Sequence, residues 1–264
     1  MLRNLLSKNY VPAFTLCLLL STVLLFSACS NSSSNDDNFD DGVLINILDI
    51  LGEENLNILE NELDMPIYRG DNPPNIEAVF ASLMFNTSEY GTMNQSTGAS
   101  FLIKPLVMKE SVVPGDENRN PNSFWDLYVQ LSNQNMENYT ITFQNRHIQE
   151  PQGLSTASYI MGEDDTFTVA GQVVNIMTVG DEEREVKSVQ VLSGRLTDEG
   201  VADTHFAIMM VDNAEVPDRI PNGTGRSFED GTGLSEPAEF PGTGDEESGR
   251  PAPGDFTSVF GLLQ

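Results

Sequence analysis

The chain has 264 residues, of which 40 are acidic and 13 are basic, giving a formal charge of −27. This excess of negative charge excludes a conventional nucleic-acid binder, because the phosphate backbone would be repelled. An apolar fraction of 39% is sufficient for a hydrophobic core, whereas two cysteines are too few for a disulfide scaffold.

Residues 1–28 have the pattern of an export signal. Arg3 and Lys8 precede an apolar run over 11–26, and the region holds no acidic residue. Basic residues followed by a short apolar run are typical of a signal peptide. The run is shorter than the roughly 20 residues that a membrane-spanning helix needs. Small residues then stand directly before Cys29.

This ending, Leu25-Phe26-Ser27-Ala28-Cys29, resembles the signal of bacterial lipoproteins, which is cleaved before a cysteine that carries lipid. The resemblance implies lipidation at Cys29 and membrane anchoring through it. Ser30 resembles the pattern for outer-membrane delivery, and the acidic stretch over 30–41 resembles surface-export signals of Bacteroidetes-type lipoproteins. An ordinary secretory signal and an uncleaved anchor are the alternatives. If Cys17 leaves with the signal, the mature chain has no free thiol.

Two segments precede the predicted main domain. Residues 29–42 are polar and acidic and predict a tether, because such a composition cannot bury apolar area. Residues 43–65 predict a short helical segment, in which Leu56, Leu59 and Leu63 recur at helical spacing with polar residues between them. We expect this helix to pack on the domain that follows.

The segment that opens the main domain reads PIYRGDNPPNIEA, from Pro66 to Ala78. It resembles a PIYxGxNPPxIEG-like motif in an uncharacterised group of Bacteroidetes-type outer-membrane lipoproteins, with Ala78 in place of the final glycine. The resemblance extends over roughly 56–236. It implies a β-domain after the motif and no known activity.

From Ile76 onward the apolar pattern changes to a period of two, which predicts strands. Tyr139, Ile141 and Phe143 alternate with polar neighbours, whereas the run over 205–211 is apolar on both faces. The predicted strands cover 76–85, 99–108, 124–132, 138–147, 154–162, 166–177, 185–196 and 201–212.

Short polar links between these strands predict an antiparallel up-and-down meander over 66–213. The fold class is therefore mainly β, closing into a barrel that is lipocalin-like in outline or into a sandwich, with a short N-terminal helix. We expect the strand over 201–212 to separate the interior from a covering helix. A packed interior is favoured over a lumen for one small ligand.

The C-terminal region over 214–264 is acidic and rich in glycine and proline. Its composition over 217–255 is typical of a loop-rich or disordered segment. Residues 255–263 form an apolar run that predicts a possible last strand.

Catalytic and metal motifs are absent from the sequence. There is no Gly-x-Ser-x-Gly, and we interpret His147 and His205 as a rim and a wall residue of the β-domain. No His-Glu-x-x-His occurs, so no zinc site is predicted. The loop that begins at Asp116 has oxygen ligands at EF-hand positions 1, 3 and 5, but Pro121 replaces the required glycine and Leu127 the final acid.

Asp126 follows Trp125 and lies near Tyr128, a combination that could face a sugar if a second carboxylate were held nearby. A core tryptophan with a solvated neighbour is the commoner arrangement. We therefore predict a non-enzymatic, lipid-anchored outer-membrane lipoprotein without cofactor or metal, which serves binding or envelope structure. A glycan, a small apolar ligand and an envelope protein are the expected partners. A carbohydrate-active enzyme and a small-ligand carrier are the alternatives.

Overall fold

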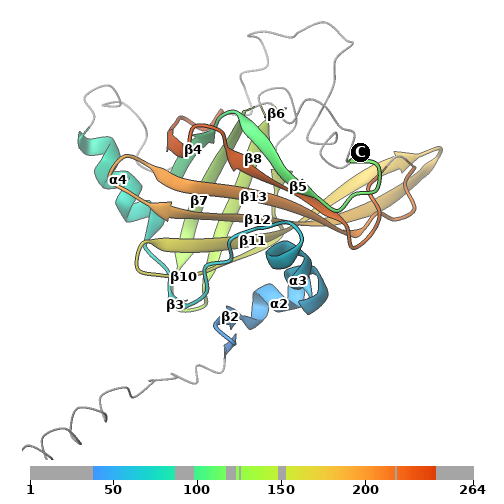
Figure 1. The fold of residues 1–264 in the computed structure, drawn as a ribbon, viewed down its shortest axis with the longest axis horizontal. Helices are drawn as coiled ribbons and strands as arrows, with labels where there is room; N and C mark the ends of the chain where they lie inside the picture. Colours follow the sequence, from blue (N-terminus) through green and yellow to red (C-terminus); the bar gives the residue numbers. More distant parts are fainter. Residues whose placement is uncertain are drawn as a thin grey trace, which may run out of the picture. The chain divides into compact units, whose positions relative to one another are not determined.

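A computed structural model describes residues 38–86, 98–116, 123–124, 126–147, 153–217 and 219–241. The predicted signal peptide, Cys29 and the possible strand over 255–263 lie outside the described residues. What is described is mainly β, with a large antiparallel sheet and a few short helices (Figure 1). Within the described part of the chain, no helix is both long enough and apolar enough to cross a membrane.

The N-terminal part contains β1 (Phe39–Asp40), β2 (Val43–Leu44), α2 (Ile45–Leu51) and α3 (Glu53–Asn61). Gly52, at a φ of +83°, joins the two helices, and this positive φ suits glycine because it has no Cβ. Leu56 and Leu59 are buried on one face of α3. The predicted amphipathic helix is therefore present.

Residues 76–86 are helical, so the predicted strand over 76–85 is wrong. Helix α4 (Ile76–Asn86) begins directly after Asn75, whose side-chain oxygen accepts a hydrogen bond from the backbone N–H of Ala78 at 3.0 Å. This is an N-cap, which stabilises a helix start. Ile76 and Phe80 are buried one helical turn apart. The spacing of four residues, and not the alternation, decides the structure here.

The sheet has thirteen strands. They are β3 (Asp71–Asn72), β4 (Ala99–Ile103), β5 (Leu106–Ser111), β6 (Ser123–Phe124), β7 (Leu127–Asn135), β8 (Thr140–His147), β9 (Gly153–Leu154), β10 (Ala157–Glu163), β11 (Thr166–Val179), β12 (Glu182–Leu196), β13 (Val201–Asp212), β14 (Gly225–Asp230) and β15 (Leu234–Pro237). Apart from β9, strands β7 to β13 lie side by side in sequence order, as the meander requires. Only β3 pairs in parallel, with β10.

Two further predictions about strands are corrected. The single strand over 99–108 is divided into β4, which pairs with β7 and β15, and β5, which pairs with β14 and β6. Strands β14 and β15 lie within 217–255, where a loop-rich or disordered segment was expected. In β14 the inward positions are Arg226 and Phe228, both fully buried. Because a charged residue, Arg226, stands at one of these inward positions, the sequence of β14 does not show the apolar alternation by which a strand is recognised.

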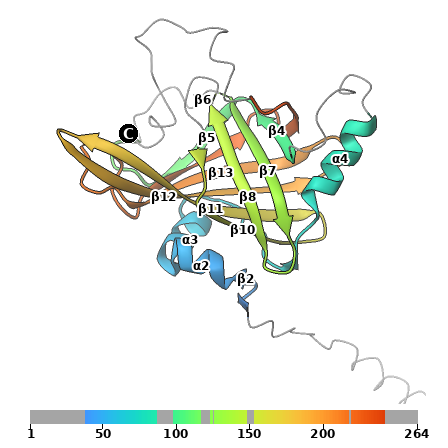
Figure 2. The ribbon, with the colours of Figure 1, turned by 180° about the vertical axis from the view of Figure 1, so that it is seen from behind.

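Strand β13 separates two hydrophobic clusters, as its two apolar faces predicted. Phe206 and Ile208 belong to the inner cluster, which side chains from the other strands and from α4 complete. Ala207 and Met209 face the opposite way and contact the cluster formed by α2 and α3. Figure 2 shows these two helices against the outer face of β10 to β13. Burial of both faces explains why this strand shows no polar side.

The inner cluster is filled by aromatic side chains, in agreement with a packed interior. Phe101, Phe143, Phe167, Phe206 and Phe228 are each less than 2% exposed. Burying one such side chain stabilises the folded state by roughly 1.5–3 kcal/mol. The inner cluster therefore carries a large part of the stability of the domain.

Candidate functional site

The acid that opens the predicted oxygen-rich loop belongs to a buried ion pair. Asp116 is 7% exposed, and its carboxylate accepts hydrogen bonds from Arg226 Nε at 2.5 Å and Nη2 at 3.1 Å. Ser111 Oγ donates a third bond, at 2.7 Å. The carboxylate of Asp116 therefore has a structural role. Among the described residues, no group of histidine, cysteine and acidic side chains is arranged to hold a metal ion.

The proposed sugar-facing cluster and one histidine are only partly described. Asp126 and Tyr128 are half-buried and flank the buried Leu127 at the start of β7. Trp125 lies outside the described residues, as does the side chain of His147, which ends β8. Both interpretations stay predictions.

The first candidate site is a cleft of about 920 Å³ at the end of the sheet where two hairpin turns approach α4 and β15. We call it the acidic cleft, and its acids are Asp164, Asp165, Asp198, Glu199 and Glu236. Its apolar surface comes from Val79, Leu83, Leu196, Leu234 and the adjacent prolines. The combination is an apolar floor with an acidic rim.

Hydrogen bonds fix the two turns that carry most of these acids. The backbone N–H of Leu196 donates to the carbonyl of Asp165 at 2.7 Å, which links the β10–β11 turn to the β12–β13 turn. Thr197 Oγ1 accepts from the backbone N–H of Glu199 at 3.2 Å and of Gly200 at 3.1 Å. Such a side-chain bond stabilises a tight turn. Asp198 and Glu199 are consequently held exposed at its tip.

Ion pairing in the acidic cleft is sparse. Glu236 lies 3.3 Å from Lys104 Nζ, and both side chains are largely exposed. The other four acids form no ion pair within the described part of the chain, and none of the residues that line the cleft is basic. The cleft is therefore a region of negative potential with an apolar surface.

The second candidate site is a groove of about 510 Å³ between the end of α3 and β13. We call it the Tyr68 groove, and its lining residues are Glu60, Asp64, Met65, Pro66, Ile67, Tyr68, Lys109, Asp203 and His205. Part of the PIY-containing motif therefore forms one wall. His205 lies in β13, as the interpretation of a wall residue predicted, and its side chain is 15% exposed.

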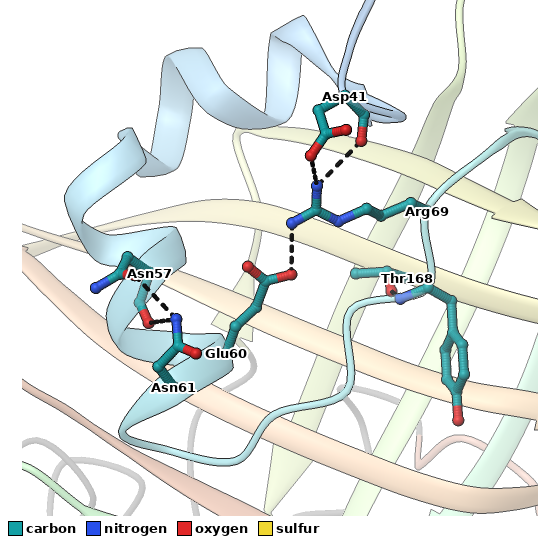
Figure 3. A network of polar contacts seen from close by, with 7 residues as sticks. Asp41, Asn57, Glu60, Asn61, Arg69 and Thr168 are labelled. Carbon is teal, nitrogen blue, oxygen red and sulfur yellow. Dashed lines mark hydrogen bonds and ion pairs between the residues drawn. The ribbon is translucent and has the colours of Figure 1, made fainter. Parts of the chain in front are cut away.

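Each acid of the Tyr68 groove has a basic partner. Arg69 binds Glu60 at 2.7 Å and also reaches Asp41, as Figure 3 shows. Lys109 Nζ lies 2.8 Å from Asp64, and this hydrogen bond lowers the pKa of Asp64. In the third pair, Arg195 lies 3.0 Å from Asp203.

Tyr68 and His205 supply further polar groups to the same groove. The backbone N–H of Tyr68 donates to Thr168 Oγ1 at 2.8 Å, which fixes the wall to β11. Burial raises the pKa of the Tyr68 hydroxyl, and the charge of Asp203 raises it further. His205 Nδ1 lies 3.0 Å from the carbonyl of Asp203 and so carries the proton, because a carbonyl can only accept.

The interior also contains polar side chains. The amide of Asn145 donates to the side-chain oxygen of Gln190, and both residues are buried. The hydroxyl of Ser188, on the same face of β12, is fully buried and has no hydrogen-bond partner among the residues that the structure describes. These groups lie within the core and line neither candidate site.

The acids of the cleft were not singled out from the sequence, although a signal was present. Alternate turns of an antiparallel meander lie at the same end of the sheet. Both acidic turns, Glu163–Asp165 and Thr197–Gly200, fall between consecutive predicted strands. Their shared position follows from the strand order. Comparison with protein-family models, curated proteins and solved structures finds no match for the chain.

Proposed function

We propose that this protein is a lipid-anchored outer-membrane lipoprotein whose β-domain binds a cationic, amphipathic partner in the acidic cleft. One observation carries the proposal: the cleft combines apolar surface with five carboxylates, of which one has a basic partner among the described residues. A partner with basic side chains on one face and apolar side chains on the other would match both properties. An envelope protein with such a segment is the partner class we favour.

We infer that the sheet closes as a barrel, which would hold the two acidic turns at one end. The pairings that support this inference run from β4 through β7 to β12 and β13, and return through β15 to β4. Backbone nuclear Overhauser contacts between Glu236 and Leu102, which are register partners, are the expected signature. Their absence would favour the sandwich.

The anchoring proposal has its own test. The lipobox-like ending at Cys29 predicts incorporation of a palmitate analogue during growth. The label should disappear in Cys29→Ala, whereas Cys17→Ala should retain it, because Cys17 would leave with the signal. A label that survives Cys29→Ala would contradict lipidation at this position.

Binding in the acidic cleft can be tested with a synthetic amphipathic peptide of lysine and leucine. Its affinity for the wild-type chain is compared with that for a triple variant, Asp164→Asn, Asp198→Asn and Glu199→Gln. We expect a loss of at least about tenfold, because three surface charges that attract the peptide are removed. Fluorescence anisotropy of the labelled peptide provides the measurement.

The chain offers a control of equal charge. The triple variant Asp181→Asn, Glu182→Gln and Glu183→Gln changes three acids at the β11–β12 turn, and none of these residues lines the cleft. We expect it to retain nearly all of the affinity. An equal loss in both variants would show that net charge, and not the cleft, attracts the peptide. A peptide of glutamate and leucine should not bind either protein.

A further inference from the structure

The charges of the Tyr68 groove are compensated within the groove and its immediate surroundings. Glu60, Asp64 and Asp203 pair with three different bases at 2.7, 2.8 and 3.0 Å. A ligand therefore needs no charge of its own to satisfy the acids that line the groove. This distinguishes the groove from the acidic cleft.

Hydrogen-bonding capacity nevertheless remains open in the groove. In the neutral ring with the proton on Nδ1, the other ring nitrogen of His205, Nε2, can accept a hydrogen bond, and it lies 3.9 Å from the Glu229 carboxylate, beyond hydrogen-bond distance. Within the described part of the chain, the Tyr68 hydroxyl forms no hydrogen bond. The Asp64 and Asp203 pairs each engage one carboxylate oxygen. Open acceptors thus lie beside the Tyr68 hydroxyl and the remaining N–H donors of Lys109.

The groove also has apolar surface beside these polar groups. Ile67 and Tyr68 are half-buried, and Met65 is buried beneath them among the side chains that cover the outer face of the sheet. The wall is fixed on both sides, because the Tyr68 N–H is bound to Thr168 and Arg69 is bound to two acids. A site of this kind needs little reorganisation before it binds a ligand.

We propose that the Tyr68 groove binds a neutral saccharide. A pyranose ring supplies several hydroxyl donors for the open acceptors at His205, Asp64 and Asp203, and an apolar C–H face for Ile67 and the Tyr68 ring. It carries no charge, so the three ion pairs need not be broken. A volume of about 510 Å³ accommodates one or two sugar rings.

The proposal is tested by calorimetric titration of the purified full-length lipoprotein with cellobiose, maltose, mannobiose, galactobiose and chitobiose. At least one of these disaccharides should bind. Tyr68→Phe removes one hydroxyl, and His205→Leu removes the ring acceptor. Each should weaken binding by about three- to tenfold, the effect of losing one neutral hydrogen bond. His205→Gln, which keeps an acceptor, should restore part of the affinity.

Tyr159→Phe is the matched control, because Tyr159 is also half-buried but lies on β10, outside the groove. It should bind as the wild type does. The proposal is overturned if none of the five disaccharides binds, or if Tyr68→Phe and His205→Leu bind as well as the control. Circular dichroism of each variant separates loss of binding from loss of folding.

Discussion

The acidic cleft and the Tyr68 groove lie on the same sheet beside different helices, and they differ in how their charges are arranged. Four of the five acids in the cleft form no ion pair among the described residues, whereas each acid in the groove has a basic partner. The excess negative charge can attract cations only where it is uncompensated. A formal charge of −27 therefore says little about the ligand of a particular site.

The origin of the difference lies in how the two sites are assembled. Two hairpin turns of neighbouring strands supply four acids of the cleft, and these turns contain no base. The groove combines α3, the motif after it, β5 and β13, and the surrounding elements contribute bases. Lys109 of β5 reaches Asp64, which follows α3, and Arg195 of β12 reaches Asp203 on the neighbouring strand β13, eight positions away. Tertiary contact supplies the compensation.

The largest effects are expected from substitutions of buried side chains in the helix beside each site. Phe80→Ala should lower the free energy of unfolding by about 3–5 kcal/mol and Leu59→Ala by about 2–5 kcal/mol, because both side chains are almost fully buried. Phe80 lies on α4 beside the cleft, and Leu59 lies on α3 beside the groove. Urea unfolding followed by circular dichroism provides the measurement.

Each of these variants, assayed while folded, should weaken binding at its own site more than at the other. Ile176→Ala is the control, because this side chain is 68% exposed and its loss should change the free energy of unfolding by no more than about 0.5 kcal/mol. Equal weakening at both sites in either core variant would show that the sites are coupled through the sheet.

The salt dependence of ligand affinity should differ between the two sites. Raising the salt concentration from about 0.1 M to about 1 M shortens the Debye length from about 10 Å to about 3 Å. We expect the lysine–leucine peptide to lose at least about tenfold in affinity for the cleft. Disaccharide affinity for the groove should change by less than about twofold. A salt-sensitive disaccharide would contradict the view that charge in the groove is compensated.

Removing one of the basic partners should leave an acid of the groove uncompensated, as the acids of the cleft are. Arg69→Met removes the ion pairs with Glu60 and Asp41, which are partly exposed, and should cost up to about 1 kcal/mol of stability. The uncompensated Glu60 should then give the groove a measurable affinity for the lysine–leucine peptide. The double variant Arg69→Met, Glu60→Gln should lose that affinity again. Anisotropy titration of all three proteins tests this sequence of effects.

The smallest effect concerns the ionisation of Tyr68. Because burial raises its pKa above the ordinary 10.0, the folded state favours the neutral phenol. This contribution to stability is fully present below pH 10.0 and is lost as the pH rises through the raised pKa. Subtracting the ultraviolet absorbance titration of Tyr68→Phe from that of the wild type isolates the ionisation of the Tyr68 phenol. The pKa obtained in this way should be higher in the folded protein than in protein unfolded by urea. Coincident curves would contradict the burial of the hydroxyl.

Prediction from the sequence succeeded where one pattern dominated locally. The leucine spacing of α3, the alternation of β8 and the apolar run of β13 identified these elements. It failed at α4, where a capping asparagine and buried residues four positions apart outweigh an apparent alternation. It also failed at β14, because the buried Arg226 carries a charge whose partner, Asp116, lies 110 positions away.

The sequence by itself determined a mainly β chain, its antiparallel meander, and the amphipathic helix that packs outside it. These features depend on local periodicity, which a window of a few residues contains. Only the tertiary structure decided where the acids meet and which of them are compensated. Ion pairs join residues from different strands and helices, so their arrangement follows from the register of the sheet and not from the composition of any one segment.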